Sequence, residues 1–220
     1  MKDVQTALRA AGFDPGGIDG KFGPATKRSI LAALGALRAS QGASSEPLSV
    51  VPFDWMPQAK MARVIVHWTA GAHQPNQTDK AHYHILIDGT GKLHRGEFSI
   101  KANEAPQPGK YAAHTLNANT GSIGVSLCGM LGAQERPFEP GPFPINKVQW
   151  AKLLEVLRDL CRRYGIEVDQ RTVLTHAEVQ ANLGIAQRAK WDIAVLPWMP
   201  GASSAQVIGA MMRNELRALV

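Results

Sequence analysis

Two histidines and an aspartate stand where a folded chain could bring them together around a metal ion. His67 lies at the end of the apolar run 62–68, and His176 closes the shorter run 172–176. A β-strand that ends in a histidine presents the imidazole at the edge of a sheet, where a cleft can form. With Asp192, these side chains would offer two neutral nitrogens and a carboxylate oxygen. Three protein ligands plus a water are typical of a catalytic zinc, whereas structural zinc sites are closed by four ligands, mostly thiolates.

Several apolar runs are expected to form the strands that position these residues. Residues 62–68 suit a central strand buried on both faces. Further strands are predicted at 83–88, 92–95, 122–128 and 172–176, with a hairpin turn at 88–91. The polar stretch 73–80 is expected to be a surface loop, and 102–119 a long irregular segment.

Two helices are predicted in the second half of the chain. The first covers 146–164, because Asn146 is a good N-cap, Gln149 completes a capping box and Gly165 ends the apolar periodicity. The second covers 206–219. Strands separated by helices and long loops predict an α/β fold with a mixed central β-sheet and helices packed on it.

Composition narrows the classes of partner. The chain has 220 residues, 45% of them hydrophobic, which is ample for a packed core. A net charge of +6 favours anionic partners such as an envelope polymer, while the absence of long basic blocks argues against nucleic acid.

No apolar run is long enough for a membrane span, and no signal peptide is recognisable at Met1. Cys128 and Cys161 form no CxxC pair, which excludes a thiolate zinc site. Both are expected to be buried thiols, and the alternative is a single disulfide between them.

The first forty residues are predicted to form a small domain of their own. A short helix over 2–11 is followed by a loop rich in glycine and proline, and then by a helix that starts at Pro24 and should bury Leu31 and Leu34. The pattern Val4-Gln5-x-x-Leu8, Gly12-Phe13, Asp19-Gly20-x-Phe22-Gly23-x-x-Thr26 resembles a peptidoglycan-binding repeat. We therefore expect a small helical domain at 1–40 that binds peptidoglycan, a flexible linker at 41–50 and a second domain at 51–220. The alternative is a helical hairpin that only packs on the second domain.

The second domain resembles the zinc-dependent N-acetylmuramoyl-L-alanine amidases, which include amidase-type phage lysozymes and the peptidoglycan recognition proteins. The matching blocks, in order, are 66–71, 83–87, His114 with Asn119 and 122–125, 175–176, and Lys190-x-Asp192. The resemblance implies that His67, His176 and Asp192 bind Zn²⁺ and that Tyr83 and Lys190 line the reacting amide.

The implied chemistry suits these residue types. Zinc would lower the pKa of a bound water and polarise the carbonyl, and Lys190 would stabilise the oxyanion. Tyr83 would hold the carbonyl or relay a proton, and neighbouring cations would lower its pKa. Some members of the family have a glutamate as general base where this chain has Ser126, so the match is closer to the phage type, in which tyrosine and lysine share the task. The interval from His176 to Asp192 is also longer than in the family.

Three further residues are candidates for substrate binding. His114 is the strongest of these candidates, and the alternative interpretation is that it has a purely structural role. Asn119 belongs to the same block, and Trp68 flanks a metal ligand, where it could also serve only as a wall of the cleft.

The resulting hypothesis is a peptidoglycan hydrolase that cleaves the amide between N-acetylmuramic acid and L-alanine. A recognition module without catalysis is one alternative, which the complete ligand set opposes. Cytoplasmic recycling of muropeptides is another, which the wall-binding repeat opposes. A phage endolysin accommodates all the features, because it is made in the host cytoplasm without a signal peptide and reaches the wall when lysis releases it. We expect a monomer.

Overall fold

The computed structural model of the chain describes residues 1–40, 49–199, 201 and 204–220. It divides into two compact units, Met1–Leu48 and Ser49–Val220. Most of the predicted linker, residues 41–48, lies outside the described residues. Each unit is described separately below.

The first unit consists of α1 (Lys2–Ala10) and α2 (Pro24–Ser40), joined by the predicted glycine-rich loop. Gln5, which is 1% exposed, organises that loop. Its Nε2 donates to Asp19 Oδ1 at 3.0 Å, and its Oε1 accepts from the Gly20 N–H at 2.8 Å. Leu31 and Leu34 are 59% and 52% exposed, so the prediction that they are buried is wrong. A unit of two helices has too little chain to cover both faces of α2.

The second unit is built on a mixed five-stranded sheet, which confirms the predicted fold class. Its strands are β1 (Arg63–Trp68), β2 (Ile85–Ile87), β3 (Leu93–Arg95), β4 (Ser122–Leu127) and β5 (Val173–Thr175). Their order is β3-β2-β4-β1-β5. Only β3, the second strand of the predicted hairpin, is antiparallel to its neighbour.

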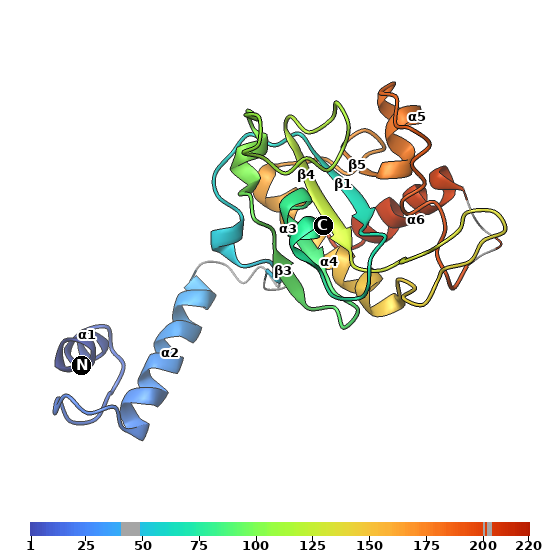
Figure 1. Ribbon diagram of the computed structural model, residues 1–220. Coiled ribbons are helices and arrows are strands. Elements are labelled where there is room, and N and C mark those ends of the chain that lie inside the picture. Colours follow the sequence, from blue (N-terminus) through green and yellow to red (C-terminus); the bar gives the residue numbers. More distant parts are fainter. Residues whose placement is uncertain (41–48, 200, 202–203) are drawn as a thin grey trace. The chain divides into compact units, whose positions relative to one another are not determined.

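One face of the sheet carries the main hydrophobic core. Val64, Val66 and Trp68 of β1 belong to this core together with apolar residues of α4 (Lys147–Tyr164) and α6 (Ala205–Arg217). Figure 1 shows these two helices beside the sheet. Helix α4 begins and ends as predicted, with a capping box between Asn146 and Gln149 and a left-handed Gly165 at φ 64°. The alternate residues of the strands point to the opposite face, which therefore remains available for a functional site.

That opposite face holds a smaller apolar cluster of Ile65, Ala118, Leu174 and Val179. Helix α5 (Val179–Leu183) contributes Val179 to this cluster and directly follows η3 (His176–Glu178). Further short elements are α3 (Gln77–His82), η2 (Ile100–Asn103) and η1 (Phe53–Trp55), whose Trp55 packs on the main core. The expected loop at 73–80 is wrong, because Asn76 and Asp79 form a capping box that starts α3. None of the helices in the described part of the chain has the length and apolar character needed to cross a membrane.

Candidate active site

Three polar atoms converge on the face of the sheet opposite the main core. Nδ1 of His67 lies 3.0 Å from Nδ1 of His176, which lies 3.3 Å from Oδ2 of Asp192. The third side of this triangle, from His67 Nδ1 to Asp192 Oδ2, is 3.6 Å. Within the described residues, these three form the one group with metal-binding geometry. Ligand atoms about 2.0–2.1 Å from a tetrahedral zinc lie about 3.3 Å apart, so the spacing fits such an ion.

Parallel pairing of the strands explains the convergence. His67 is near the end of β1, and His176 directly follows β5, which pairs with β1. The carboxyl ends of parallel strands meet at one edge of the sheet, so the two imidazoles lie side by side although 109 residues separate them. Asp192 arrives from the loop after α5. The N–H of Ala177 donates to the Asp192 carbonyl at 3.3 Å and ties this loop to the His176 turn.

Hydrogen bonds at the other ring nitrogen fix the tautomer of His176. Its Nε2 lies 2.9 Å from Oε1 of Gln187. The Gln187 amide cannot be turned around, because its Nε2 donates to the Leu116 carbonyl at 2.8 Å. His176 Nε2 therefore carries the hydrogen, and Nδ1 presents a lone pair to the centre.

A second chain of hydrogen bonds fixes His67 in the same way. His114 Nε2 donates to the Ser122 carbonyl at 3.3 Å, so its Nδ1 is an acceptor. Nδ1 of His114 lies 3.2 Å from Nε2 of His67. The hydroxyl oxygen of Thr115 lies 3.4 Å from Nε2 of His67 as well. His67 Nε2 therefore carries the hydrogen, and its Nδ1 also presents a lone pair. Two imidazole lone pairs and one carboxylate thus face each other, a donor set that fits a divalent cation.

Titration behaviour supports the same assignment. Burial lowers the pKa of His67 to about 4, although the nearby Asp192 carboxylate acts in the opposite direction. Burial alone would raise the pKa of Asp192, but the neighbouring imidazoles of His176 and His67 hold it below its ordinary value. Near neutral pH the site therefore contains an uncharged His67 and an ionised Asp192, which are the forms that bind metal.

The segment that carries Lys190 and Asp192 has an unusual backbone. Ala189 and Ile193 on either side have φ angles of 53° and 63°, in the left-handed region. This conformation is rare for a β-branched residue, and it costs about 1–3 kcal/mol. Ile193 is fully buried in the main core, so packing offsets the strain and holds Asp192 toward the histidines.

Tyr83 lies beside the triangle of ligand atoms. Its ring centroid is 5.1 Å from that of His67. Burial raises the pKa of Tyr83, and the carboxylates of Asp192 and Asp79 add to the effect, which is opposite in direction to the shift predicted from neighbouring cations. The hydroxyl of Ser126 is near Tyr83. It is buried and makes no hydrogen bond with the described residues.

A recess of about 450 Å³ opens over this centre. Its walls include His176 and Asp192 from the triangle and Tyr83, Lys190, His114 and Asn119 from the other predicted site residues. Lys190 is exposed, whereas His114 is 6% exposed. The recess is the size of a small-molecule or oligomer-end site, and its lining combines the candidate ligands with a cation and hydroxyl and amide groups.

The predicted substrate-binding residues occupy three different positions. His114 lines the recess and supports His67 from behind. Asn119 also lines it, and its Oδ1 accepts from the N–H groups of His114 and Thr115 at 3.1 and 2.9 Å, which orders that turn. Trp68 points to the opposite face of β1, is 4% exposed and packs at 4.6 Å between ring centroids on Trp191. The structure therefore places Trp68 outside the recess.

Sequence reasoning missed three residues that support the site. Gln187 and Thr115 orient the histidines, but neither stands in a recognisable motif. Gly124 lies under His114, and a Cβ there would come within 2.6 Å of the imidazole. A glycine inside an apolar strand is a signal of such close approach, so Gly124 could have been found from the sequence. Cys128 and Cys161 are free and buried, as expected, and burial raises the pKa of each thiol to about 12.

The solved structures to which the chain is similar include amidases and peptidoglycan recognition proteins. The endolysin amidase LysCS from Clostridium intestinale URNW is 14% identical, with 76% of this chain and 93% of that chain covered at a TM-score of 0.45. The Ph2119 endolysin from Thermus scotoductus MAT2119 bacteriophage Ph2119 is 18% identical, with 65% and 83% covered at a TM-score of 0.41. A bumblebee peptidoglycan recognition protein is 14% identical, with 67% and 79% covered at a TM-score of 0.40. No curated protein sequence matches the chain.

Two family models match the chain, and they identify the family to which it belongs. A model described as a putative peptidoglycan binding domain matches residues 1–33. A model described as N-acetylmuramoyl-L-alanine amidase matches residues 57–197, which span the whole candidate site and well over half of the chain. The chain therefore belongs to the N-acetylmuramoyl-L-alanine amidase family.

Proposed function

We propose that this peptidoglycan amidase depends on zinc, held by Nδ1 of His67, Nδ1 of His176 and Oδ2 of Asp192. The observation that carries the proposal is the convergence of these three atoms with 3.0, 3.3 and 3.6 Å between them. Both imidazoles have their hydrogen on the far side, so the centre offers lone pairs and a negative charge. Such a set is stabilised by a cation and is unfavourable without one.

The bond cleaved is the amide between N-acetylmuramic acid and the L-alanine of the stem peptide. When bound, zinc supplies a water of lowered pKa and polarises the carbonyl. Lys190, exposed on the wall of the recess, attracts the negative charge that develops on the carbonyl oxygen. Tyr83, whose burial favours the protonated hydroxyl, donates a hydrogen bond to the same oxygen. His114 and Asn119 line the recess and contact the substrate.

The experiment that tests this function is digestion of purified sacculi. An amidase releases new L-alanine amino termini, and these should appear in proportion to solubilised material. New reducing sugar ends without new amino termini would mean that the enzyme is a glycosidase, and the proposal would be wrong. The same digestion after chelation and dialysis should be inactive, and it should regain activity when Zn²⁺ is added back.

The proposal extends to where the enzyme works. The first unit retains the residues of the peptidoglycan-binding pattern, among them Gln5 and Asp19 in the organised loop. We infer that this unit holds the enzyme on the wall and that a phage uses it for host lysis after membrane damage. Cells that express the protein alone should stay intact until chloroform or a holin permeabilises the inner membrane. Lysis without permeabilisation would contradict release at lysis.

A further inference from the structure

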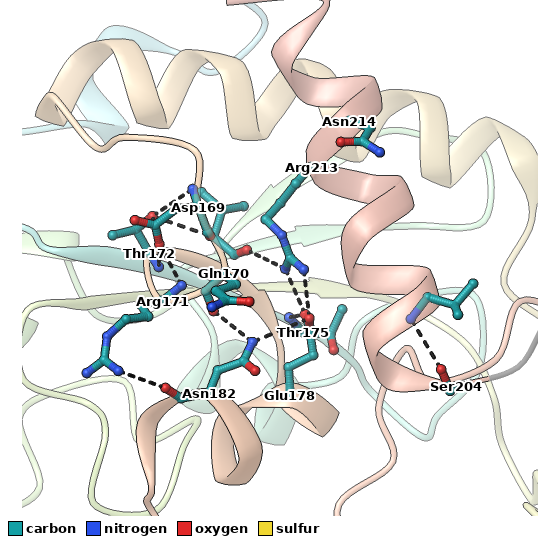
Figure 2. Close-up of polar contacts among 12 residues, drawn as sticks. Asp169, Gln170, Arg171, Thr172, Thr175, Glu178, Asn182, Ser204, Arg213 and Asn214 are labelled. Atoms are coloured by element: carbon teal, nitrogen blue, oxygen red, sulfur yellow. Dashed lines mark hydrogen bonds and ion pairs between the residues drawn. The ribbon is translucent and has the colours of Figure 1, made fainter.

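The C-terminal helix reaches the metal centre through one buried ion pair. Arg213 of α6 donates to both carboxylate oxygens of Glu178, with distances of 3.0 Å from Nη1 to Oε2 and 2.9 Å from Nη2 to Oε1. The two side chains are 7% and 1% exposed. Figure 2 shows the guanidinium extending from α6 to the turn that contains Glu178. Glu178 is two residues after His176, so this pair adjoins a proposed ligand.

Both partners also hold the backbone on the strand side of His176. Oε2 of Glu178 accepts from the N–H of Thr175, the residue before His176, at 3.0 Å. Nη1 of Arg213 donates to the carbonyl of Val173, at the start of β5, at 3.1 Å. The ion pair therefore fastens the strand, the turn and the helix to each other around His176.

Helix α6 has a glycine at the position where the Glu178 carboxylate packs against it. Gly209 lies one turn before Arg213, and a Cβ at that position would come within 2.1 Å of Glu178 Oε2. Glycine inside a helix costs about 1 kcal/mol relative to alanine. The helix thus has an unfavourable residue at the position where the carboxylate packs.

Stability alone is a weak reason for such an arrangement. Desolvation offsets much of the attraction in a buried ion pair, and a well-packed apolar pair of similar volume is often equally stable or more so. A bidentate pair adds a fixed direction, because both N–H···O bonds must be aligned. Through the bonds to the Thr175 N–H and the Val173 carbonyl, the pair also fixes the backbone of the strand that leads to His176.

We propose that Glu178 and Arg213 are positioning residues that orient His176 for metal binding, so that α6 sets the metal affinity of the site. This inference rests on the proposed metal centre. It concerns neither substrate nor bond cleavage, so its test uses Zn²⁺ alone, added to the full chain without peptidoglycan.

The experiment compares Glu178→Gln, Arg213→Lys and the double variant Glu178→Leu/Arg213→Leu with a matched control. The control is Asp159→Asn, because Asp159 is also a buried carboxylate, but it accepts from the N–H groups of Val50 and Val51 instead of holding a ligand turn. Zinc affinity is measured by competition with a chromophoric chelator, geometry by the visible spectrum of the Co²⁺ form, and stability by thermal unfolding of the metal-free chain.

We expect the three site variants to bind zinc about 10–100-fold more weakly, the usual effect of removing a group that orients a ligand, with a changed Co²⁺ spectrum. The double variant should unfold near the wild-type temperature, which separates positioning from stability. Asp159→Asn should unfold earlier and still bind zinc within about twofold of wild type. Wild-type affinity in both Glu178→Gln and the double variant, or an equal loss of affinity in Asp159→Asn, would overturn the inference. A wild-type chain that binds no zinc would overturn the metal centre itself, and this inference with it.

Discussion

The Nδ1 atoms of His67 and His176 lie 3.0 Å apart, and each ring has its hydrogen on the opposite nitrogen. Two lone pairs at this distance repel, and the Asp192 carboxylate adds a negative charge beside them. The fold therefore holds the ligand atoms in place against their mutual repulsion. A bound cation would relieve it, so metal binding should stabilise the chain.

We expect about one zinc per chain and a higher unfolding temperature with zinc than without it. His67→Ala, His176→Ala and Asp192→Ala should each lose the metal, the zinc-dependent stabilisation and the activity. Elemental analysis, thermal unfolding and sacculus digestion measure these three effects. The control is His82→Ala, because His82 is exposed and lies at the rim of the recess. Normal zinc content in one of the three ligand variants would remove that residue from the ligand set.

Lys190→Ala should retain zinc and substrate binding and lower kcat by about 10²–10³, the usual cost of losing one oxyanion donor. The reason is that an ammonium attracts the oxyanion of the intermediate more strongly than the neutral amide of the substrate. Steady-state kinetics on a soluble muropeptide separates kcat from KM. A kcat within about twofold of wild type would show that Lys190 is only a surface charge.

Tyr83→Phe should behave like Lys190→Ala if the hydroxyl donates to the carbonyl oxygen. The ring that packs beside His67 is kept, so zinc affinity should not change. A large loss of zinc in Tyr83→Phe would instead assign the residue to the support of the ligands.

Deletion of residues 1–48 should leave a folded amidase that binds zinc, because Ser49–Val220 is a compact unit of its own. Binding to intact sacculi should fall, while cleavage of a small soluble muropeptide should change by less than about twofold. Sedimentation with sacculi and kinetics on the soluble substrate provide the two readouts. An equal loss in both would mean that the first unit contributes to the catalytic fold.

The metal-free chain should lose stability as the pH falls from about 6.5 to about 4. Burial lowers the pKa of His67 and of His84 to about 4, below the ordinary value of about 6.5. In this window the unfolded chain binds protons that the folded chain does not, so acid favours unfolding by up to about 1.4 kcal/mol per pH unit for each histidine.

Urea unfolding at several pH values, with metal removed, measures this slope. His84→Asn should reduce it, because His84 is buried between the Gly124 N–H and Asn103 Oδ1, outside the ligand set. Stability that rises as the pH falls through this window would have the wrong sign for buried neutral histidines.

Features that depend on a short stretch of sequence, such as strands and helix ends, were predictable from the sequence. The strand that contains His67 is an apolar run, and the caps of α4 at Asn146 and Gly165 are local signals with a fixed meaning. The mixed sheet followed from such runs, and the order of the motif blocks indicated the family.

Features set by tertiary contacts were not predictable. The exposure of Leu31 depends on how much chain is available to cover it. The role of Gln187 depends on the path of a loop, and its sequence neighbourhood contains no motif. The pKa of Tyr83 is raised by burial and by the carboxylates of Asp192 and Asp79, which only the folded chain brings together. Trp68, by contrast, could have been placed from the sequence, because it directly follows His67 and successive side chains of a strand point to opposite faces.

The pairing of β1 with β5 also bears on the time course of folding. The first strand of the sheet pairs with the last, and His67 and His176 come into contact only when the chain between them has closed. Contacts of such long sequence separation form slowly, because loop closure must precede them. Refolding in the presence of Co²⁺ should therefore show the metal's absorbance appearing with the slowest phase. A newly made chain would then acquire its ion after the sheet is complete, so the rate of folding limits when catalysis begins.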